Sequence, residues 1–300
     1  MSSVELPTWS KRSTEATRYA EGENASWALE LLTSCALLSQ PFKSFHVNPS
    51  PMIAVRLRSV LVPEGLTAFA STPSSQAPPT IRLIVYPTPL RVSYHAVASL
   101  VPQLLAHYDP DYIFHIGMAG GRDCYALETR AHRDGYRIRD VDGRDGYAAG
   151  EARWRKETNA NGQFLPDVLE CGWNVEDVER RWRGALGLPP ETEEGEEPKV
   201  QMSLDAGRFL CDFTFYESLS LRWREGRERV GKVCFFHVPG ETDDASVWRG
   251  VRVAEAAIRS VVTSWEAGVR REQATEGVAD GQGESKEEER ERRAGLGHPS

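Results

Sequence analysis

Residues 81–116, IRLIVYPTPLRVSYHAVASLVPQLLAHYDPDYIFHI, carry the pattern that decides the fold. The stretch begins with Ile81–Tyr86, a run rich in β-branched residues that predicts a strand. Apolar residues then recur at helical spacing over 92–107, and Tyr112–Ile116 (YIFHI) is strand-like again. A strand, a helix and a second strand at this spacing predict a βαβ unit with a parallel sheet.

The alternation of strands and helices continues on both sides of this unit. Upstream, the apolar run Ser26–Leu38 fits either a short helix or a buried strand, and its periodicity does not decide between them. Downstream, the expected elements are a strand at Lys199–Ser203, a helix at Asp205–Trp223 with Ser203 or Asp205 as N-cap, a strand at Val233–Val238 and a final helix capped by Asp243 or Asp244. The pattern predicts a single α/β domain, with three layers (α/β/α) around a mostly parallel, twisted sheet.

The domain is expected to span residues 26–266, and three segments are expected to add little to its core. Residues 1–25 are polar and weakly patterned, and the charged tail 267–300 is expected to be disordered because it has little to bury. The segment at about 142–198 is rich in Gly, Arg and Glu, and we expect much of it to lie over the surface as an insertion. We favour a solvated surface for its acidic tract, 191–197, over a partner-binding role.

Composition limits the classes of function. The chain has 300 residues, of which 36 are Lys or Arg and 44 are Asp or Glu, which gives a formal net charge of -8. No basic stripe is present for contacts to phosphates, so a nucleic-acid partner is not expected. No apolar run approaches the roughly 18 residues that cross a bilayer, and the first residues lack the pattern of a secretory signal. The expected location is cytoplasmic, with no membrane partner.

The 5 cysteines are scattered along the chain. They form no C-x-x-C pair and have no histidine at zinc-ligand spacing, which predicts reduced thiols and no metal site. A cysteine in such a chain is most often a small buried residue, so a catalytic role has to be argued from its surroundings.

Three stretches contain residues suited to chemistry: HIGMAGGRDCYALE at 115–128, SLDAGRFLCDFTFYESL at 203–219 and CFFHVPG at 234–240. The glycines of the first stretch match neither the G-x-G-x-x-G nor the Walker spacing, so a tight exit from a strand explains them better than a phosphate site.

The other candidates each have a structural alternative. Cys211, among aromatic residues, fits a core thiol, and His237 fits a histidine at a strand end. Their joint placement favours chemistry, because Cys211 falls early in a helix, His237 ends the next strand, and open α/β sheets bind ligands at that edge. With Glu128 nearby, a nucleophile, a base and an orienting carboxylate could converge there, and the reaction class would be acyl transfer.

The same residues resemble the motifs of the pyroglutamyl peptidase I family, peptidase family C15. Glu128 followed by HRDGY at 132–136 is similar to the glutamate motif of the family, DAGRFLCDFTFY at 205–216 to its cysteine motif and FHVP at 236–239 to its histidine motif. The motifs occur in the order of the family, and the similarity runs from about Phe42 to Trp265. The chain resembles a divergent, fungal-type member.

This resemblance implies a cysteine-type omega peptidase that removes N-terminal pyroglutamate from peptides through an acyl-enzyme. It implies that Cys211 is the nucleophile, His237 the general base and acid, and Glu128 the residue that orients His237. The positions that match the wall of the pyroglutamyl pocket are Phe42, Phe209 and Leu210. The family uses no metal and no organic cofactor, and the expected partner is a peptide substrate.

One stretch departs from the family pattern. Ser39 stands where the first pocket phenylalanine of a Gly-Phe-x-Pro-Phe loop belongs, so half of an aromatic clamp on the lactam ring is missing. One lost ring contact costs roughly 1–3 kcal/mol of binding. The alternative function is therefore a weak or inactive homologue that binds pyroglutamyl peptides. An unrelated α/β hydrolase is not supported, because the chain has no Gly-x-Ser-x-Gly elbow.

Overall fold

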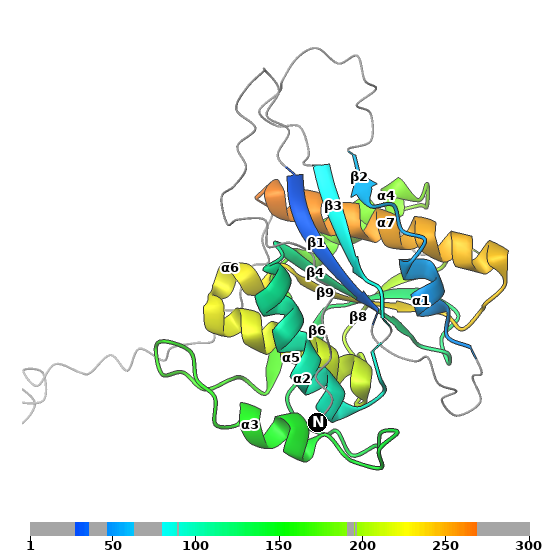
Figure 1. Cartoon of the computed structure of the whole chain (residues 1–300). Coiled ribbons are helices and arrows are strands. Elements are labelled where there is room, and N and C mark those ends of the chain that lie inside the picture. The colour runs from blue at the N-terminus through cyan, green and yellow to red at the C-terminus, as the bar shows by residue number, and fades with distance from the viewer. Residues whose placement is uncertain are drawn as a thin grey trace, which may run out of the picture. The chain divides into compact units, whose positions relative to one another are not determined.

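The computed structural model describes residues 28–35, 47–62, 80–88, 90–190, 195 and 197–268 (Figure 1). The N-terminal segment 1–25, residues Ser39 and Phe42, and all but the first two residues of the tail 267–300 lie outside the described residues. The domain boundaries therefore stay a prediction.

A seven-stranded sheet, in the order β2-β3-β1-β4-β9-β5-β8, forms the centre of the described part of the chain. Its strands are β1 (Ala28–Cys35), β2 (Val60–Leu61), β3 (Thr80–Tyr86), β4 (Tyr112–Met118), β5 (Tyr125–Glu128), β8 (Val200–Ser203) and β9 (Val233–Val238). Neighbouring strands run parallel except in the pairs β2/β3 and β5/β9, which are antiparallel. The predicted βαβ unit is confirmed, and the undecided run Ser26–Leu38 contains a strand.

Helices cover both faces of the sheet (Figure 1). One face carries α1 (Pro49–Ala54), α4 (Val175–Ala185) and α7 (Asp244–Glu266), and the other carries α2 (Tyr94–Tyr108), α5 (Leu210–Glu225) and α6 (Arg227–Val230). A short π-helix, η1 (Tyr147–Glu151), continues into α3 (Ala152–Trp154). Separately, β6 (Arg130–His132) pairs with β7 (Val168–Glu170) in a two-stranded antiparallel sheet. The three-layer α/β fold predicted from the sequence is confirmed.

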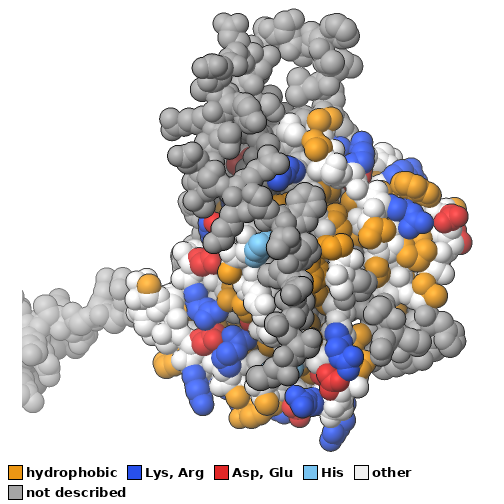
Figure 2. Space-filling view, in the orientation of Figure 1, with side chains coloured by type: hydrophobic (Ala, Val, Ile, Leu, Met, Phe, Trp, Pro, Cys, Tyr) orange, Lys and Arg blue, Asp and Glu red, His pale blue; other side chains and the backbone are white. Residues whose placement is uncertain are grey.

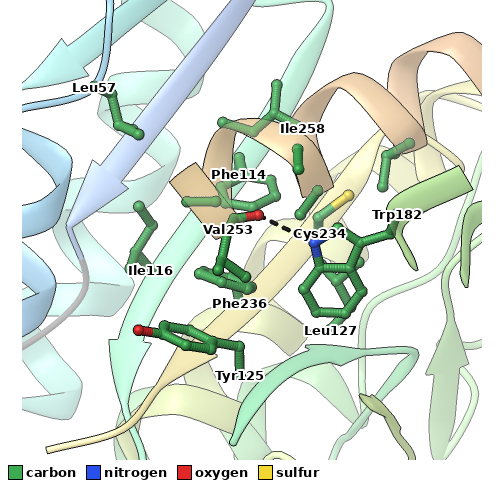
Figure 3. Packing of buried hydrophobic residues seen from close by; sticks show 14 of the residues in the cluster. Leu57, Phe114, Ile116, Tyr125, Leu127, Trp182, Cys234, Phe236, Val253 and Ile258 are labelled. Carbon is green, nitrogen blue, oxygen red and sulfur yellow. Dashed lines mark hydrogen bonds between the residues drawn. The ribbon is translucent and has the colours of Figure 1, made fainter. Parts of the chain in front are cut away.

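The two central strands explain this layering. Every residue of β9 is buried, as is every residue of β4 except the last, because a strand covered on both faces needs a continuous apolar run. Side chains alternate between the faces. Phe114 and Phe236 pack beneath α7, whereas Ile113 and Phe235 pack beneath α2 and α5. Figure 3 shows the first of these clusters.

One expectation about a helix start is corrected, and one about a helix cap is confirmed. The helix expected to start after an Asp205 or Ser203 cap begins at Leu210, and its N-cap is Phe209, which provides no side-chain hydrogen bond. The Asp205 carboxylate instead accepts a hydrogen bond from Gly207 N at 3.0 Å, within the loop that precedes the helix. The cap predicted for the final helix is confirmed, because Asp243 accepts from Ser246 N at 3.0 Å.

Segment 142–198 also contributes more to the core than its composition indicates. Its tryptophans Trp154, Trp173 and Trp182 have no exposed surface. Trp182 of α4 packs against Phe236 and donates a hydrogen bond to the carbonyl of Val253 in α7, at 3.0 Å (Figure 3). The three tryptophans were a sequence signal that the segment is buried, but the many charged residues between them concealed this signal.

Replacing Trp182 with alanine tests whether this segment is part of the folding core. We expect Trp182→Ala to lower the free energy of unfolding by about 3–5 kcal/mol, because the substitution opens a cavity and removes a buried hydrogen bond. Urea denaturation would measure the change. Trp248→Ala is the control, because Trp248 is 54% exposed on α7. Equal stabilities of the two variants would contradict the role of α4 in the core.

Candidate active site

The imidazole of His237 lies near the end of β9, in the middle of the sheet. His237 is paired in register with Gly117 of β4 and with Ala126 of β5, and it is only 3% exposed. Phe235 lies two residues earlier and therefore on the same face of the strand. Its ring centroid is 4.8 Å from that of His237. The side chain of His237 thus lies on the face of the sheet that α2 and α5 cover.

Cys211 is the second residue of α5, and its sulfur lies directly over β4. A Cβ atom on Gly117 would be 3.3 Å from the Sγ atom of Cys211 and 2.8 Å from the ring of Phe235, so only glycine allows this close approach. Because Gly117 is paired with His237, and neighbouring strands are about 4.8 Å apart, Sγ and the imidazole share one face at adjacent positions. The structure therefore places Cys211 and His237 on the same face of the sheet.

The beginning of α5 also provides unpaired donors beside this sulfur. The first N–H groups of an α-helix have no acceptor within the helix, and no side chain caps α5. Such N–H groups carry partial positive charge and stabilise an anion near the helix N-terminus.

A buried polar contact fixes α5 against β4. The Nε2 atom of His115 in β4 lies 2.7 Å from the hydroxyl of Ser218 in α5. Burial lowers the pKa of His115 to about 3, so its ring is neutral at physiological pH. His115 thus holds the helix that carries Cys211 in place, although its side chain is not one of the groups assembled around the sulfur.

Glu128 provides the carboxylate. Its Oε1 atom is 2.7 Å from Nδ1 of His237, and neither residue is more than 3% exposed. An ionised carboxylate only accepts hydrogen bonds, so Nδ1 carries a proton, and Nε2 is the nitrogen that points away from the carboxylate. This orientation is the one required of a general base, in which the second nitrogen takes a proton from a nucleophile.

The strand that carries Glu128 runs in the direction opposite to the one expected. In a parallel sheet all three residues would lie at the carboxyl edge of the strands, but β5 is antiparallel to β9. Glu128 is paired with Phe235 and reaches His237 diagonally across the face of the sheet. Only residues 119–124 connect β4 to β5, which is too short for a parallel crossover, so connection length was the available signal.

Arg122, a residue outside the predicted triad, also contacts this carboxylate. Its Nη1 atom donates to the same Oε1 of Glu128 at 2.8 Å, and its Nη2 atom donates to the carbonyl of Asp205 at 2.6 Å. The hydroxyl of Ser203 lies 3.4 Å from Nη1. The glycine-rich connection between β4 and β5 therefore does more than end a strand, because it delivers a guanidinium to the site.

Opposing effects set the charge of Glu128. Burial by itself would raise its pKa, but the hydrogen bond and charge of His237, together with Ser203 and Arg122, hold the pKa below its ordinary value. Glu128 is therefore ionised at neutral pH, as its hydrogen bond to His237 requires.

The electrostatics of Cys211 do not favour a preformed thiolate. Burial raises the pKa of the Cys211 thiol well above its ordinary value, and the charges of Glu128 and Asp212 act in the same direction. Arg122 and the backbone N–H of Cys211 oppose this effect without cancelling it. At rest the sulfur is protonated, so a base has to remove the proton as a bond forms.

A second buried cluster joins the glutamate and cysteine motifs. Asp212, next to Cys211, accepts a hydrogen bond from the Tyr136 hydroxyl at 3.1 Å, and its carboxylate is 3.4 Å from Nδ1 of His132 and 3.5 Å from Nη1 of Arg208. Burial raises the pKa of Asp212, although His132, Arg208 and Tyr136 oppose the shift. The HRDGY stretch thus contacts the first turn of the helix that carries the cysteine.

Of the three residues expected to line a pocket, two are described. The ring of Phe209 is half-buried and meets Tyr94 edge-on, with centroids 5.8 Å apart. Leu210 is fully buried in the cluster beneath α2 and α5. Phe42 lies outside the described residues. The roles of all three in a pocket therefore stay predictions.

The described residues contain no group of three or more His, Cys, Asp or Glu side chains arranged to hold a metal ion. Within the same residues, no helix is long and apolar enough to cross a membrane. On the face shown in Figure 2, the basic side chains that are described are scattered among acidic and apolar ones.

A thiol at a helix N-terminus, placed beside a histidine that a buried carboxylate orients, is the arrangement used by cysteine hydrolases. Comparisons with known proteins refine this class. No protein-family model matches the chain. Over 160 residues the chain is 30% identical to pyroglutamyl-peptidase 1 of Mus musculus, and this aligned region covers 53% of this chain and 63% of that protein. It is 29% identical to pyroglutamyl-peptidase 1 of Homo sapiens, with the same coverage.

Solved structures agree with these relatives. The pyrrolidone carboxyl peptidase from Thermococcus litoralis superimposes with a TM-score of 0.56 at 17% identity, covering 82% of this chain and 98% of the other. A mutant pyrrolidone carboxyl peptidase from Pyrococcus furiosus gives a TM-score of 0.54 at 18% identity, covering 80% and 100% of the two chains. The α/β fold and the similarity to pyroglutamyl peptidases are confirmed, and the chain spans less than two thirds of the curated relatives it matches.

The protonation state of Cys211 leads to a prediction about its reactivity. Because burial raises the pKa of this thiol, we expect the rate constant for alkylation by iodoacetamide to rise about tenfold per pH unit between about pH 6 and pH 9. Mass spectrometry of the peptide containing Cys211 would measure the rate separately from the other cysteines. A plateau below pH 7 would show a preformed thiolate and contradict the electrostatic description.

Proposed function

We propose that this protein is a cysteine-type omega peptidase that hydrolyses the bond after an N-terminal pyroglutamyl residue. The observation that carries the proposal is the 2.7 Å contact between Glu128 and His237, made on the face of the sheet where the sulfur of Cys211 lies over the partner strand. The similarity to pyroglutamyl-peptidase 1 proteins supports the substrate class.

In the proposed reaction, the sulfur of Cys211 attacks the carbonyl carbon of the pyroglutamyl residue while Nε2 of His237 takes the thiol proton. The oxyanion that forms is stabilised by N–H groups at the start of α5. His237 then gives its proton to the departing amine, the C–N bond breaks, and a thioester remains on Cys211. Glu128 stays ionised throughout and keeps the imidazole in the productive orientation.

Water completes the cycle. Its oxygen attacks the thioester while His237 accepts one of its protons, and collapse of the second tetrahedral intermediate releases pyroglutamic acid. The proton returns to sulfur, which restores the resting thiol. A protonated sulfur at rest fits this sequence, because proton removal by His237 accompanies bond formation in the first step. The reaction needs no metal or organic cofactor.

The nature of the substrate fits the surroundings of the sulfur. A pyroglutamyl group has no free amine and no charge, so an apolar wall with a few hydrogen-bonding groups suits its lactam ring. Phe209 lies two residues before Cys211 and is half-buried, and we propose that it and Phe42 contact the ring. We propose the same for Leu210 through its backbone, since its side chain is buried in the core. The expected cytoplasmic location stays a prediction.

Hydrolysis of pyroglutamyl-aminomethylcoumarin by the full chain tests the proposal. We expect turnover by the wild-type protein, none above background by Cys211→Ala, and a loss of about 10²–10⁴-fold in kcat for Glu128→Gln, since the amide no longer orients and stabilises the imidazolium. Cys124→Ala controls for general effects of removing a thiol and should retain turnover. Unchanged activity in Cys211→Ala would overturn the proposal, and binding without turnover by wild-type protein would favour the inactive homologue.

Gly117 provides an independent test of the geometry. We expect Gly117→Ala to lower kcat at least about tenfold, because its new methyl group would displace both the ring of Phe235 and the sulfur of Cys211. Gly121→Ala is the control, in the connection that follows β4, since a Cβ atom there would meet nothing within 4 Å. If both variants keep wild-type kcat, the sulfur does not need its position over β4.

A further inference from the structure

The guanidinium of Arg122 connects two parts of the site that are far apart in the sequence. Through Nη1 it contacts Glu128 of β5 and the hydroxyl of Ser203 at the end of β8. Through Nη2 it contacts the carbonyl of Asp205, in the loop that leads to α5. One side chain therefore holds both the carboxylate that orients His237 and the chain segment that positions Cys211.

We propose that Arg122 is a positioning residue for the reaction, which fixes the Glu128 carboxylate and the nucleophile loop relative to each other and offsets the carboxylate charge. This inference rests on the proposed function. Arg122 acts through Glu128 and the loop, and it is not proposed to contact the substrate.

The geometry gives Arg122 two separable effects. The first effect is geometric. A planar guanidinium donates hydrogen bonds in two fixed directions at once, and a lysine ammonium on its flexible stem does not reproduce this arrangement. The second is electrostatic. Oε1 of Glu128 accepts hydrogen bonds from both Nδ1 of His237 and Nη1 of Arg122. The positive charge of the guanidinium therefore weakens the electrostatic stabilisation that the carboxylate gives to a protonated imidazole. Arg122 thus offsets part of the carboxylate charge that faces His237.

Other charged and titratable groups surround the pair without replacing Arg122. From the β4/β5 connection, Asp123 forms an ion pair with Lys199 at 2.6 Å, and Cys124 lies beside them. Asp205 pairs with Arg208 at 2.9 Å, and from α5 come Cys211 and Asp212. Within the described residues, the cationic side chain in contact with the Glu128 carboxylate is that of Arg122.

Arg130 offers a matched control. Its Nε atom donates to the carbonyl of Leu204, at 2.9 Å, in the same loop that Arg122 holds. The structure gives Arg130 no hydrogen bond to Glu128, so Arg130→Gln removes one loop contact and one positive charge and leaves the carboxylate pair intact.

The experiment compares Arg122→Gln, Arg122→Lys and Arg130→Gln, each checked for folding by circular dichroism. We expect Arg122→Gln to lower kcat about 10- to 100-fold and to move the acid limb of the kcat/KM profile about one unit to higher pH. Arg122→Lys should restore the acid limb but not kcat, because it returns the charge without the fork. Arg130→Gln should keep the wild-type profile. If Arg122→Gln and Arg130→Gln have the same kcat and the same acid limb, the inference is wrong.

A second measurement keeps this test separate from the proposed function. Alkylation of Cys211 by iodoacetamide needs no peptidase activity, and we expect it to be at least about threefold slower at pH 7.5 in Arg122→Gln than in Arg130→Gln, because a positive charge beside Glu128 is lost. If wild-type protein fails to turn over a pyroglutamyl substrate, the proposed function fails and this ratio decides the inference by itself. Equal alkylation rates would then contradict it.

Discussion

The carboxylate of Glu128 has no exposed surface, and it lies where β5, β9, β8 and the β4/β5 connection meet. A buried ionised carboxylate is costly unless hydrogen bonds and opposite charge compensate it. Here His237 and Arg122 provide that compensation through the same oxygen. The need to satisfy one buried charge therefore fixes the orientation of the histidine and the position of the loop that precedes Cys211.

A second constraint acts on the sulfur. Gly117 has no side chain, so α5 approaches β4 closely enough to place Sγ at the position paired with His237. The same burial raises the pKa of the thiol. The protein thus combines close packing with a protonated thiol, and in the proposed reaction activation of that thiol depends on the imidazole that Glu128 orients. Asp212 and its contacts to Tyr136 and His132 keep the first turn of α5 in place on the other side.

Much of this fold could be predicted from sequence periodicity. The strands at β3, β4 and β9 and the helix α2 follow apolar patterns that local physics determines, and the three motifs identified Glu128, Cys211 and His237. The short connection 119–124 was a sequence signal for the direction of β5, whereas the contacts of Arg122 depend on tertiary structure, which no local pattern encodes. The burial of Trp182 also depends on tertiary structure, because its partner α7 lies far along the chain, and the charged residues around it concealed the signal.

The central claim is that the sulfur of Cys211 becomes acylated during turnover. Acid quenching of the full chain during hydrolysis of a pyroglutamyl ester, followed by intact-mass analysis and peptide mapping, tests it most directly. The account predicts a mass increase equal to one pyroglutamyl group on the peptide that contains Cys211, and none in Cys211→Ala. Turnover with no such adduct on Cys211, or with the adduct on another residue, would contradict it.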